Sequence, residues 1–289
     1  MKKKCKDFSW IFSCSFLMLF CLYPAATHAE DFRVEISPAR IEQGNAFMLR
    51  VSGLAEDSDL SAFFNEIPLR FSGCGSGCAI AIGTVDLPVE PGDYSIPLIV
   101  GDQKKTVQIT VSPGRFDVIH IEVPQDKATP GPVEMERIRK EADLLDSIWS
   151  IYSERLWEGQ FILPLPNPLS TPFGTQRIFN KTTVSIHRGL DIKGKEGEKI
   201  YASNHGRVAL TEELFFGGNT VILDHGSGIF TIYMHLSRFN VRPGDLVSKK
   251  DVIGFVGSTG RSTGPHLHFG VKVAGINTSP TSIAALDLD

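Results

Sequence analysis

The stretch that decides the fold is GPHLHFG, residues 264–270. Successive side chains of an extended strand point to opposite faces of a sheet, so His266 and His268 share one face. Leu267 and Phe269 share the other face and are both apolar. The pattern predicts a β-strand that packs one face on a core and presents two imidazoles on the other.

A second stretch, SIHRGLDI at residues 185–192, shows that the first is more than a polar strand face. His187, Gly189 and Asp191 alternate there with apolar residues. If the stretch is one strand, His187 and Asp191 lie on the same face, with side-chain-free Gly189 between them. The two stretches together supply imidazoles and a carboxylate in alternating positions.

A third stretch, TIYMHL at residues 231–236, adds another histidine. Strand alternation places Tyr233 and His235 on one polar face. His205 and His225 lie beside turn residues, and we expect them to be an exposed turn residue and a structural hydrogen-bonding residue, respectively.

These residue types suit a catalytic zinc site. Such a site takes three protein ligands, usually His nitrogens and carboxylate oxygens, and keeps one position for water. His187, Asp191 and one histidine of the 266–268 pair supply that set, although ligands without thiolate do not exclude other divalent ions. Zinc lowers the pKa of bound water from ~15.7 towards ~7. The two remaining histidines could take the proton of the water and stabilise the developing oxyanion.

The motifs resemble those of the lysostaphin-type (LytM-like) zinc metallopeptidases. The resemblance is carried by His187-x-x-x-Asp191, by YMHLS at residues 233–237, and by GSTG at residues 257–260 followed by GPHLHF. The motifs occur in the order of the family, and Phe173-Gly174 is similar to its usual lead-in. The resemblance covers roughly residues 161–280.

The resemblance implies a function and a role for each site residue. It implies that His187, Asp191 and His268 bind zinc, while His235 and His266 are catalytic and act on the water and the oxyanion. It also implies a zinc metalloendopeptidase that cuts the peptide cross-links of bacterial peptidoglycan. The expected partners are peptidoglycan stem peptides and not nucleic acid.

Two other functions compete with this interpretation. A non-catalytic LytM-like envelope protein could bind and activate cell-wall amidases, but such proteins typically lose zinc ligands, and all of them are present here. Repeated strand patterns in the C-terminal half also resemble biotin and lipoyl carriers. Those carriers need a modifiable lysine at a hairpin tip, which the sequence does not offer.

The N-terminus has the pattern of a secretory signal peptide. Four lysines precede a nearly continuous apolar run, residues 9–22, and small residues follow up to Ala29. The run is shorter than the roughly 20 residues that a membrane span needs. We therefore expect a signal peptide over residues 1–29, export to the periplasm or cell envelope, and no integral membrane span after cleavage.

Cysteine usage agrees with export. Removing residues 1–29 leaves Cys74 and Cys78 out of five cysteines, in the sequence CGSGC. In an exported chain such a pair favours a disulfide over a metal or redox site. We expect a disulfide that clasps a hairpin loop.

The remaining sequence divides into three parts and predicts a mainly β fold. Short alternating runs over residues 30–123 predict a small antiparallel, immunoglobulin-like β-sandwich that serves as a spacer or docking module. Residues 124–160 form a linker with an amphipathic helix, expected over residues 133–157. Residues 161–289 form an antiparallel β-sheet metallopeptidase domain.

Charge differs between the two halves. Residues 30–160 carry 12 basic and 22 acidic side chains, whereas residues 161–289 carry 13 and 10. The mildly basic C-terminal half suits contact with an anionic polymer, although a surface charge of this size is more often a matter of solubility.

Overall fold

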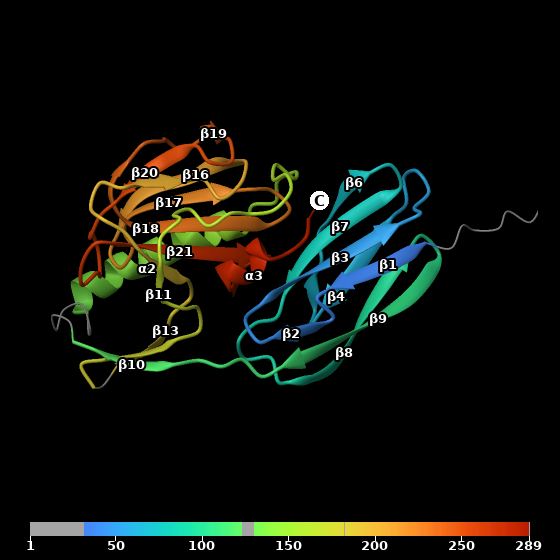
Figure 1. Ribbon diagram of the computed structural model, residues 1–289, viewed down its shortest axis with the longest axis horizontal. Helices are drawn as coiled ribbons and strands as arrows, with labels where there is room; N and C mark the ends of the chain where they lie inside the picture. The colour runs from blue at the N-terminus through green and yellow to red at the C-terminus, as the bar shows by residue number, and fades with distance from the viewer. Residues whose placement is uncertain (1–31, 123–129, 182, 289) are drawn as a thin grey trace, which may run out of the picture. The chain divides into compact units, whose positions relative to one another are not determined.

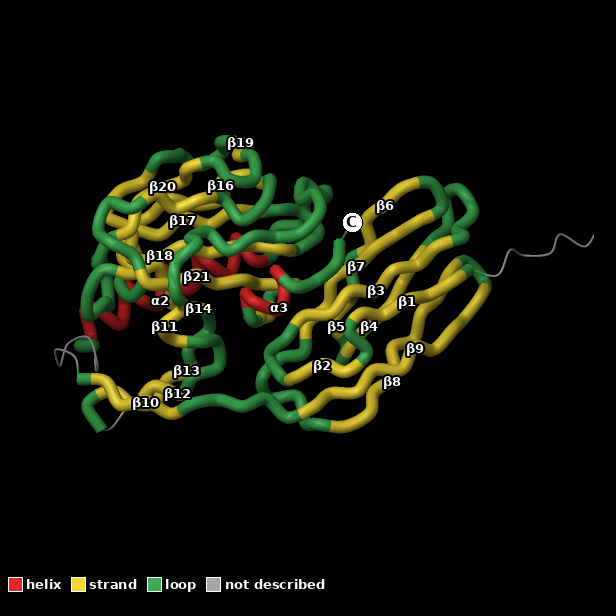
Figure 2. Tube along the Cα trace, in the orientation of Figure 1, coloured by secondary structure: helices red, strands yellow, loops and turns green. Residues whose placement is uncertain are grey.

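The computed structural model describes residues 32–122, 130–181 and 183–288. They belong to one compact unit, Asp31–Asp289, and consist mainly of strands in antiparallel sheets, as predicted (Figures 1 and 2). The predicted signal peptide, residues 1–29, lies outside the described residues. None of the described helices combines the length and the apolar composition needed to cross a membrane.

The N-terminal part forms two sheets. The first has the strand order β1-β3-β7-β6 and is antiparallel throughout. The second has the order β2-β9-β8-β4-β5, in which β2 and β9 run parallel. The strand bounds are Arg33–Ser37 (β1), Arg40–Glu42 (β2), Ala46–Ser52 (β3), Leu60–Phe64 (β4), Ile67–Pro68 (β5), Phe71–Gly75 (β6), Cys78–Thr84 (β7), Gly92–Val100 (β8) and Gln103–Ser112 (β9). The immunoglobulin-like character of this sandwich stays a prediction.

The alternating pattern of the sequence explains the core between these two sheets. Phe47, Leu49 and Val51 alternate along β3, and all three are buried in one apolar cluster. Ile96 and Leu98 from β8 in the second sheet join the same cluster. Period-two alternation therefore directs one face of each strand into a shared core.

The opposite face of the first sheet is buried as well. Met48 from β3 and Ile80 from β7 belong to the same core cluster as Leu286, near the end of the chain. The backbone N–H of Ser279 donates to the carbonyl of Gly44 at 2.7 Å. The sandwich thus packs directly against the C-terminal part.

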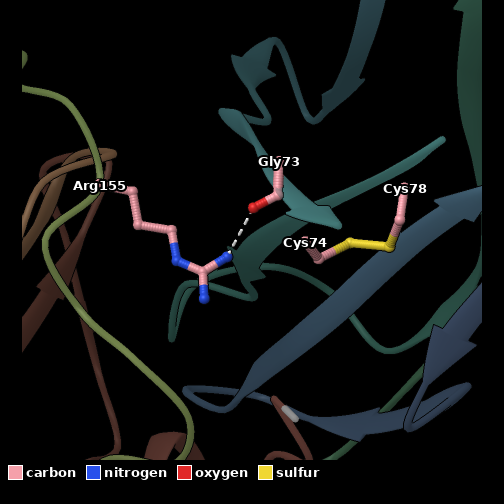
Figure 3. Close-up of a disulfide and its surroundings, with 4 residues drawn as sticks. All are labelled: Gly73, Cys74, Cys78 and Arg155. Atoms are coloured by element: carbon pink, nitrogen blue, oxygen red, sulfur yellow. Dashed lines mark hydrogen bonds between the residues drawn. A yellow bond between two sulfur atoms is a disulfide. The ribbon is translucent and has the colours of Figure 1, made fainter. Parts of the chain in front are cut away.

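The hairpin of β6 and β7 carries the predicted disulfide. Cys74 and Cys78 are bonded across its tip (Figure 3). Beside the disulfide, Nη1 of Arg155 donates to the carbonyl of Gly73 at 3.0 Å. The guanidinium of Arg155 also lies 3.8 Å above the centroid of the Trp157 ring. The hairpin is therefore linked to the segment that precedes the C-terminal sheet.

The linker contains an amphipathic helix, α2, over Pro132–Trp149. The prediction that this helix continues to residue 157 was wrong. Beyond α2, the backbone N–H groups of Leu156 and Trp157 donate to the carbonyl of His225, at 2.8 and 3.2 Å. The chain leaves the helix because these hydrogen bonds, and the burial of Trp157 in the core, tie it to the C-terminal sheet.

The C-terminal part is built on a ten-stranded antiparallel sheet. Its main path is β11-β14-β21-β18-β17-β16-β19, with β15, β20 and β22 paired beside it. A smaller sheet has the order β10-β12-β13. The bounds are Val118–Ile121 (β10), Leu169–Thr171 (β11), Gln176–Phe179 (β12), Thr183–Ile186 (β13), Leu190–Lys193 (β14), Lys199–Tyr201 (β15), Gly206–Leu214 (β16), Gly218–Asp224 (β17), Ile229–Phe239 (β18), Leu246–Val247 (β19), Val252–Val256 (β20), His266–Val273 (β21), Ile276–Thr278 (β22) and Pro280–Ala284 (α3).

Helix α2 packs on this sheet through its C-terminal turns. Ile148 is the residue of α2 that is fully buried, and it lies in a cluster with side chains of β16, β17 and β18. The ring of Trp149 meets that of Phe230 edge-on, with the centroids 5.4 Å apart. Figure 1 shows α2 running alongside the large sheet. The linker helix is therefore part of the C-terminal structure.

Candidate active site

The central strand of the site is β21, which runs between β14 and β18. His268 is in register with Asp191 of β14 on one side and with Met234 of β18 on the other. His266 and His268 are partly exposed, whereas Leu267 and Phe269 are buried. The predicted division of this strand into an apolar face and an imidazole face is confirmed.

Residues 185–192 do not form the single strand that the alternation predicted. Strand β13 ends before His187 and pairs with β12 in the small sheet, whereas β14 begins after Gly189 and pairs with β21 in the large sheet. The chain changes sheets at this point and passes close to β21. A Cβ added to Gly189 would lie 2.5 Å from Nε2 of His268, so only glycine fits this crossing without a shift.

The change of sheet brings three possible metal ligands together. Nε2 of His187 lies 3.0 Å from Oδ1 of Asp191, and Nδ1 of His268 lies 2.9 Å from each of these two atoms. Tetrahedral ligands placed about 2.0–2.1 Å from zinc are roughly 3.3 Å from one another. The three atoms are therefore close enough to share one metal ion.

The protonation of His187 supports a metal between these atoms. Its Nδ1 lies 2.8 Å from the carbonyl of Pro172, which can only accept, so Nδ1–H donates and Nε2 keeps its lone pair. Nε2 then faces the Asp191 carboxylate, which is an acceptor too, at 3.0 Å, with Nδ1 of His268 beside both atoms. Two acceptors directed at each other call for a proton or a cation between them, and the donor set fits zinc.

His235 enters the site through a bulge in β18. Between Tyr233 and Leu236 this strand has one residue more than its partner β17. His235 itself has a left-handed backbone, with φ 66°, and its N–H donates to the carbonyl of Gly217. A left-handed conformation is uncommon for a non-glycine residue and is concentrated at functional sites.

The bulge overturns the prediction that Tyr233 and His235 share a polar face. Tyr233 is fully buried in the core, and its hydroxyl is hydrogen bonded to Thr231 and to the backbone N–H of Ser203. Met234 and His235 line the cavity instead. An extra residue shifts the alternation of a strand, which a period of two does not anticipate.

His235 and His266 are held in the same way as His187. Nδ1 of His235 lies 2.8 Å from the carbonyl of Thr259, and Nδ1 of His266 lies 2.8 Å from the carbonyl of Gly264. Each Nδ1–H therefore donates to the backbone and leaves Nε2 as an acceptor. The two rings are 4.8 Å apart, and Nε2 of His266 lies 3.8 Å from Oδ1 of Asp191.

Arg177 of β12 is a site residue that the sequence did not reveal. Its Nη2 donates to Oδ2 of Asp191, which leaves Oδ1 to face the two histidines. The pair joins the small sheet to the large one across 14 residues of sequence. The position of Arg177, three residues after Gly174 of the lead-in motif, was its only signal.

The charge states follow from the surroundings. Burial alone would raise the pKa of Asp191, but its contacts with His187 and His268 outweigh burial and hold the pKa well below its usual range. Burial lowers the pKa of His268. Burial, together with the neighbouring His268 and His266, lowers the pKa of His235 to about 3. A carboxylate beside neutral imidazoles is the state that metal ligands need.

Three of the site histidines border a cavity of about 350 Å³. His187, His235 and His268 form one side, which we call the sheet wall. A second part of the lining, called the helix wall, consists of side chains from α2, namely Ile138, Glu141, Ala142 and Leu145. The amphipathic stripe predicted for the linker helix therefore borders the site as well as packing on the sheet.

Residues 185–280 match the model of Peptidase family M23. This segment is a Peptidase family M23 domain. It contains all five residues that the resemblance assigned to zinc binding or catalysis, namely His187, Asp191, His235, His266 and His268.

Curated relatives of the M23 domain are named as peptidoglycan enzymes. The DD-carboxypeptidase/endopeptidase Mpg of Neisseria meningitidis is 40% identical over 116 residues, which are 40% of this chain and 27% of that protein. The peptidoglycan DD-endopeptidase ShyA of Vibrio cholerae is 39% identical over 108 residues, 37% of this chain and 25% of that protein. The chain thus spans about a quarter of the length of these relatives.

A solved structure extends the similarity beyond the M23 domain. A crystal structure from Pseudomonas aeruginosa that is assigned to peptidase M23 covers 84% of this chain and 94% of its own, with a TM-score of 0.66 and 26% identity. The shared region is much longer than residues 185–280. The fold described here, N-terminal sheets included, therefore has a counterpart in another chain assigned to M23.

Proposed function

We propose that this protein is an exported zinc metalloendopeptidase that hydrolyses peptide cross-links of bacterial peptidoglycan. The observation that carries the proposal is the convergence of His187, Asp191 and His268 beside His235 and His266, next to a cavity that three of these histidines line. The M23 domain and the peptidoglycan endopeptidases among its relatives supply the reaction class and the substrate.

In this proposal each polar residue has a defined task. Nε2 of His187, Oδ1 of Asp191 and Nδ1 of His268 hold the metal ion. A zinc ion bound there would supply Lewis-acid activation of a water molecule and of the scissile carbonyl. Arg177 holds the second carboxylate oxygen and so orients Asp191.

The two remaining histidines handle protons and developing charge. Nε2 of His266 and Nε2 of His235 keep their lone pairs because each Nδ1–H is committed to a backbone carbonyl. One imidazole can accept the proton of the attacking water, and the other, once protonated, can stabilise the oxyanion. The left-handed backbone of His235 places its ring next to that of His266.

The non-catalytic alternative, an activator of cell-wall amidases, has less support. Such a protein needs a binding surface but no metal ligands. Here the three candidate ligands and both additional histidines are retained, and backbone carbonyls hold Nδ1 of His187, His235 and His266 in the same way. Export rests on the leader pattern and agrees with the disulfide. The intact mass of protein recovered from the cell envelope should correspond to a chain that begins at Glu30, and a mass that includes the leader would contradict export by this route.

Digestion of purified peptidoglycan sacculi tests the activity. The protein should release muropeptides whose cross-links have been cut, as identified by mass spectrometry, and a chelator should abolish the release until zinc is restored. His205→Ala is a matched control, because this histidine does not border the cavity. Release of no cut cross-links, or release that a chelator does not affect, would contradict the proposal.

A further inference from the structure

His235 is oriented by the loop that links β20 to β21, residues 257–265. Nδ1 of His235 lies 2.8 Å from the carbonyl oxygen of Thr259 in this loop. The hydrogen bond keeps the proton on Nδ1 and the lone pair on Nε2 for as long as the carbonyl stays in place. The position of one backbone carbonyl therefore fixes the tautomer and the orientation of a candidate catalytic group.

The side chain of Thr259 fastens this carbonyl to the two strands beside it. Its Oγ1 accepts from the backbone N–H of Asn219 in β17 at 2.9 Å and donates to the carbonyl of Leu236 in β18 at 2.8 Å. Asn219 and Leu236 are paired at the edge of the bulge that contains His235. One hydroxyl thus connects both strands where their register shifts, because it is a donor and an acceptor at once.

The backbone around Thr259 leaves little room for the carbonyl to move. A Cβ added to Gly218 would lie 2.4 Å from the carbonyl carbon of Thr259, and a Cβ added to Gly260 would lie 2.2 Å from the backbone nitrogen of Gly218. The backbone N–H of Arg261 donates to the carbonyl of Phe216 at 2.9 Å. The loop therefore lies directly against the hairpin between β16 and β17, and the threonine hydroxyl anchors it at the bulge.

We propose that Thr259 is a positioning residue for His235, whose hydroxyl fixes the carbonyl that holds the imidazole in its reactive orientation. The inference rests on the proposed function and deepens it, because it gives a task to a residue that does not border the cavity. A threonine that only stabilised the loop would make the same hydrogen bonds without any effect on the chemical step. The two roles therefore predict different values of kcat.

Two substitutions at Thr259 test the inference. Thr259→Val keeps the shape of the side chain but loses both hydrogen bonds, and its kcat for a cross-linked muropeptide should fall about 10- to 100-fold because the imidazole is displaced. KM and zinc content should change little. Thr259→Ser restores the hydroxyl and should recover most of the lost kcat. Thr278→Val is the matched control: it removes a buried hydroxyl that donates to the carbonyl of Gly44 at 3.0 Å, and it should lower the Tm without lowering kcat.

A double-mutant cycle separates positioning from stability. If Thr259 acts through His235, adding Thr259→Val to His235→Ala should cause no further loss of kcat, because the ring that it orients is already absent. NMR spectra of protein with nitrogen-labelled histidine report the tautomer. His235 should carry its proton on Nδ1 in the wild type and partly on Nε2 in Thr259→Val.

Three results would overturn the inference and leave the proposed function intact. They are a wild-type kcat in Thr259→Val, an equal loss of kcat with and without His235, and an unchanged tautomer of His235 in Thr259→Val. Failure of the wild-type protein to cleave the muropeptide would overturn the proposed function, and this inference with it.

Discussion

The two walls of the cavity are held in different ways. On the sheet wall, His187 and His235 each donate from Nδ1 to a backbone carbonyl, and the strands beneath them are paired on both sides. On the helix wall, Ala142 of α2 is exposed, and Ile138 and Leu145 are only partly buried. The chemistry is therefore placed on a rigid scaffold, whereas the surface that would contact the rest of a substrate belongs to a helix with fewer constraints.

The helix wall is attached at a small number of points. Besides the apolar contacts near Ile148, the carboxylate of Glu141 accepts from the N–H of Phe215 at 2.9 Å, and Nη2 of Arg137 donates to the carbonyl of Glu213 at 2.6 Å. Few buried contacts allow local opening at low free energy. Changes in the sheet wall should therefore affect the chemical step, and changes in the helix wall should affect substrate fit.

The largest expected effect on the sheet wall comes from His235→Ala. The variant should keep its zinc, because His235 is not one of the three proposed ligands, but its kcat should fall by ~10²–10⁴, the usual contribution of a general acid–base or charge-stabilising group. Zinc content and turnover of a cross-linked peptide are measured on the same sample. Near-normal turnover would show that the bulge at His235 has no catalytic purpose.

A buried histidine of the large sheet, outside the cavity, makes stability depend on pH. His225 is fully buried between strands, and burial lowers its pKa to about 4. Below pH 6.5, the ordinary pKa of histidine, His225 is protonated in the unfolded chain but stays neutral in the folded protein. The free energy of unfolding therefore falls as the pH decreases. His225 alone should account for a loss of about 1.6 kcal/mol between pH 6.5 and pH 5.

Denaturant unfolding at fixed zinc concentration checks this slope. His225→Gln should lose part of the slope, although His235, whose pKa is lowered in the same direction, retains its share. His205→Ala, at a partly exposed turn position, should keep the wild-type slope. A stability that does not change between pH 6.5 and pH 5 would contradict the neutral, buried state of His225.

Arg177 connects the small sheet to the candidate metal ligands, and Arg177→Gln should reduce both zinc affinity and kcat/KM by about 10-fold. The reason is that Asp191 loses the donor that fixes its second oxygen. Competition with a chromophoric chelator reports zinc affinity independently of turnover. Arg207→Gln, which removes an exposed contact to the carbonyl of Gly244, is the control. Wild-type zinc affinity in Arg177→Gln would contradict the proposal that Arg177 positions Asp191.

The smallest effect is expected on the helix wall. Glu141→Ala removes the acceptor for the N–H of Phe215 and should raise KM about two- to five-fold, with little change in kcat, because about 1 kcal/mol or less is lost at a partly exposed contact. Hydrogen exchange of α2 should become faster. Glu136→Ala changes an exposed carboxylate that pairs within the helix. It should change neither KM nor the rate of hydrogen exchange of α2. A fall in kcat without a change in KM in Glu141→Ala would contradict the assignment of the chemical step to the sheet wall and of substrate fit to the helix wall.

One strand of the site, β21, was predictable because its residues follow strand periodicity. The alternation of His266 and His268 with Leu267 and Phe269 predicted the strand and the character of its two faces. The ligand set followed from the chemistry of the residue types and the family resemblance. Alternation works here because β21 has neighbours on both sides and one fully buried face.

The remaining features depend on tertiary contacts that no local pattern contains. The bulge at His235 depends on the register of β18 against β17, and the change of sheet at Gly189 depends on which neighbours β13 and β14 find. The end of α2 at Trp149 depends on hydrogen bonds to His225. The pairing of Arg177 with Asp191 likewise joins two sheets, and it becomes visible only when both are assembled.

The central claim is that two histidines of one strand face have different roles, and a single comparison tests it. Zinc content and turnover of a cross-linked muropeptide are measured for His268→Ala and His266→Ala side by side. His268→Ala should lose zinc and activity together, because two protein ligands are too few for a tight site. His266→Ala should keep stoichiometric zinc and its fold yet lose activity by ~10²–10⁴. A fully active His266→Ala protein, or one that loses zinc while His268→Ala retains it, would contradict the assignment.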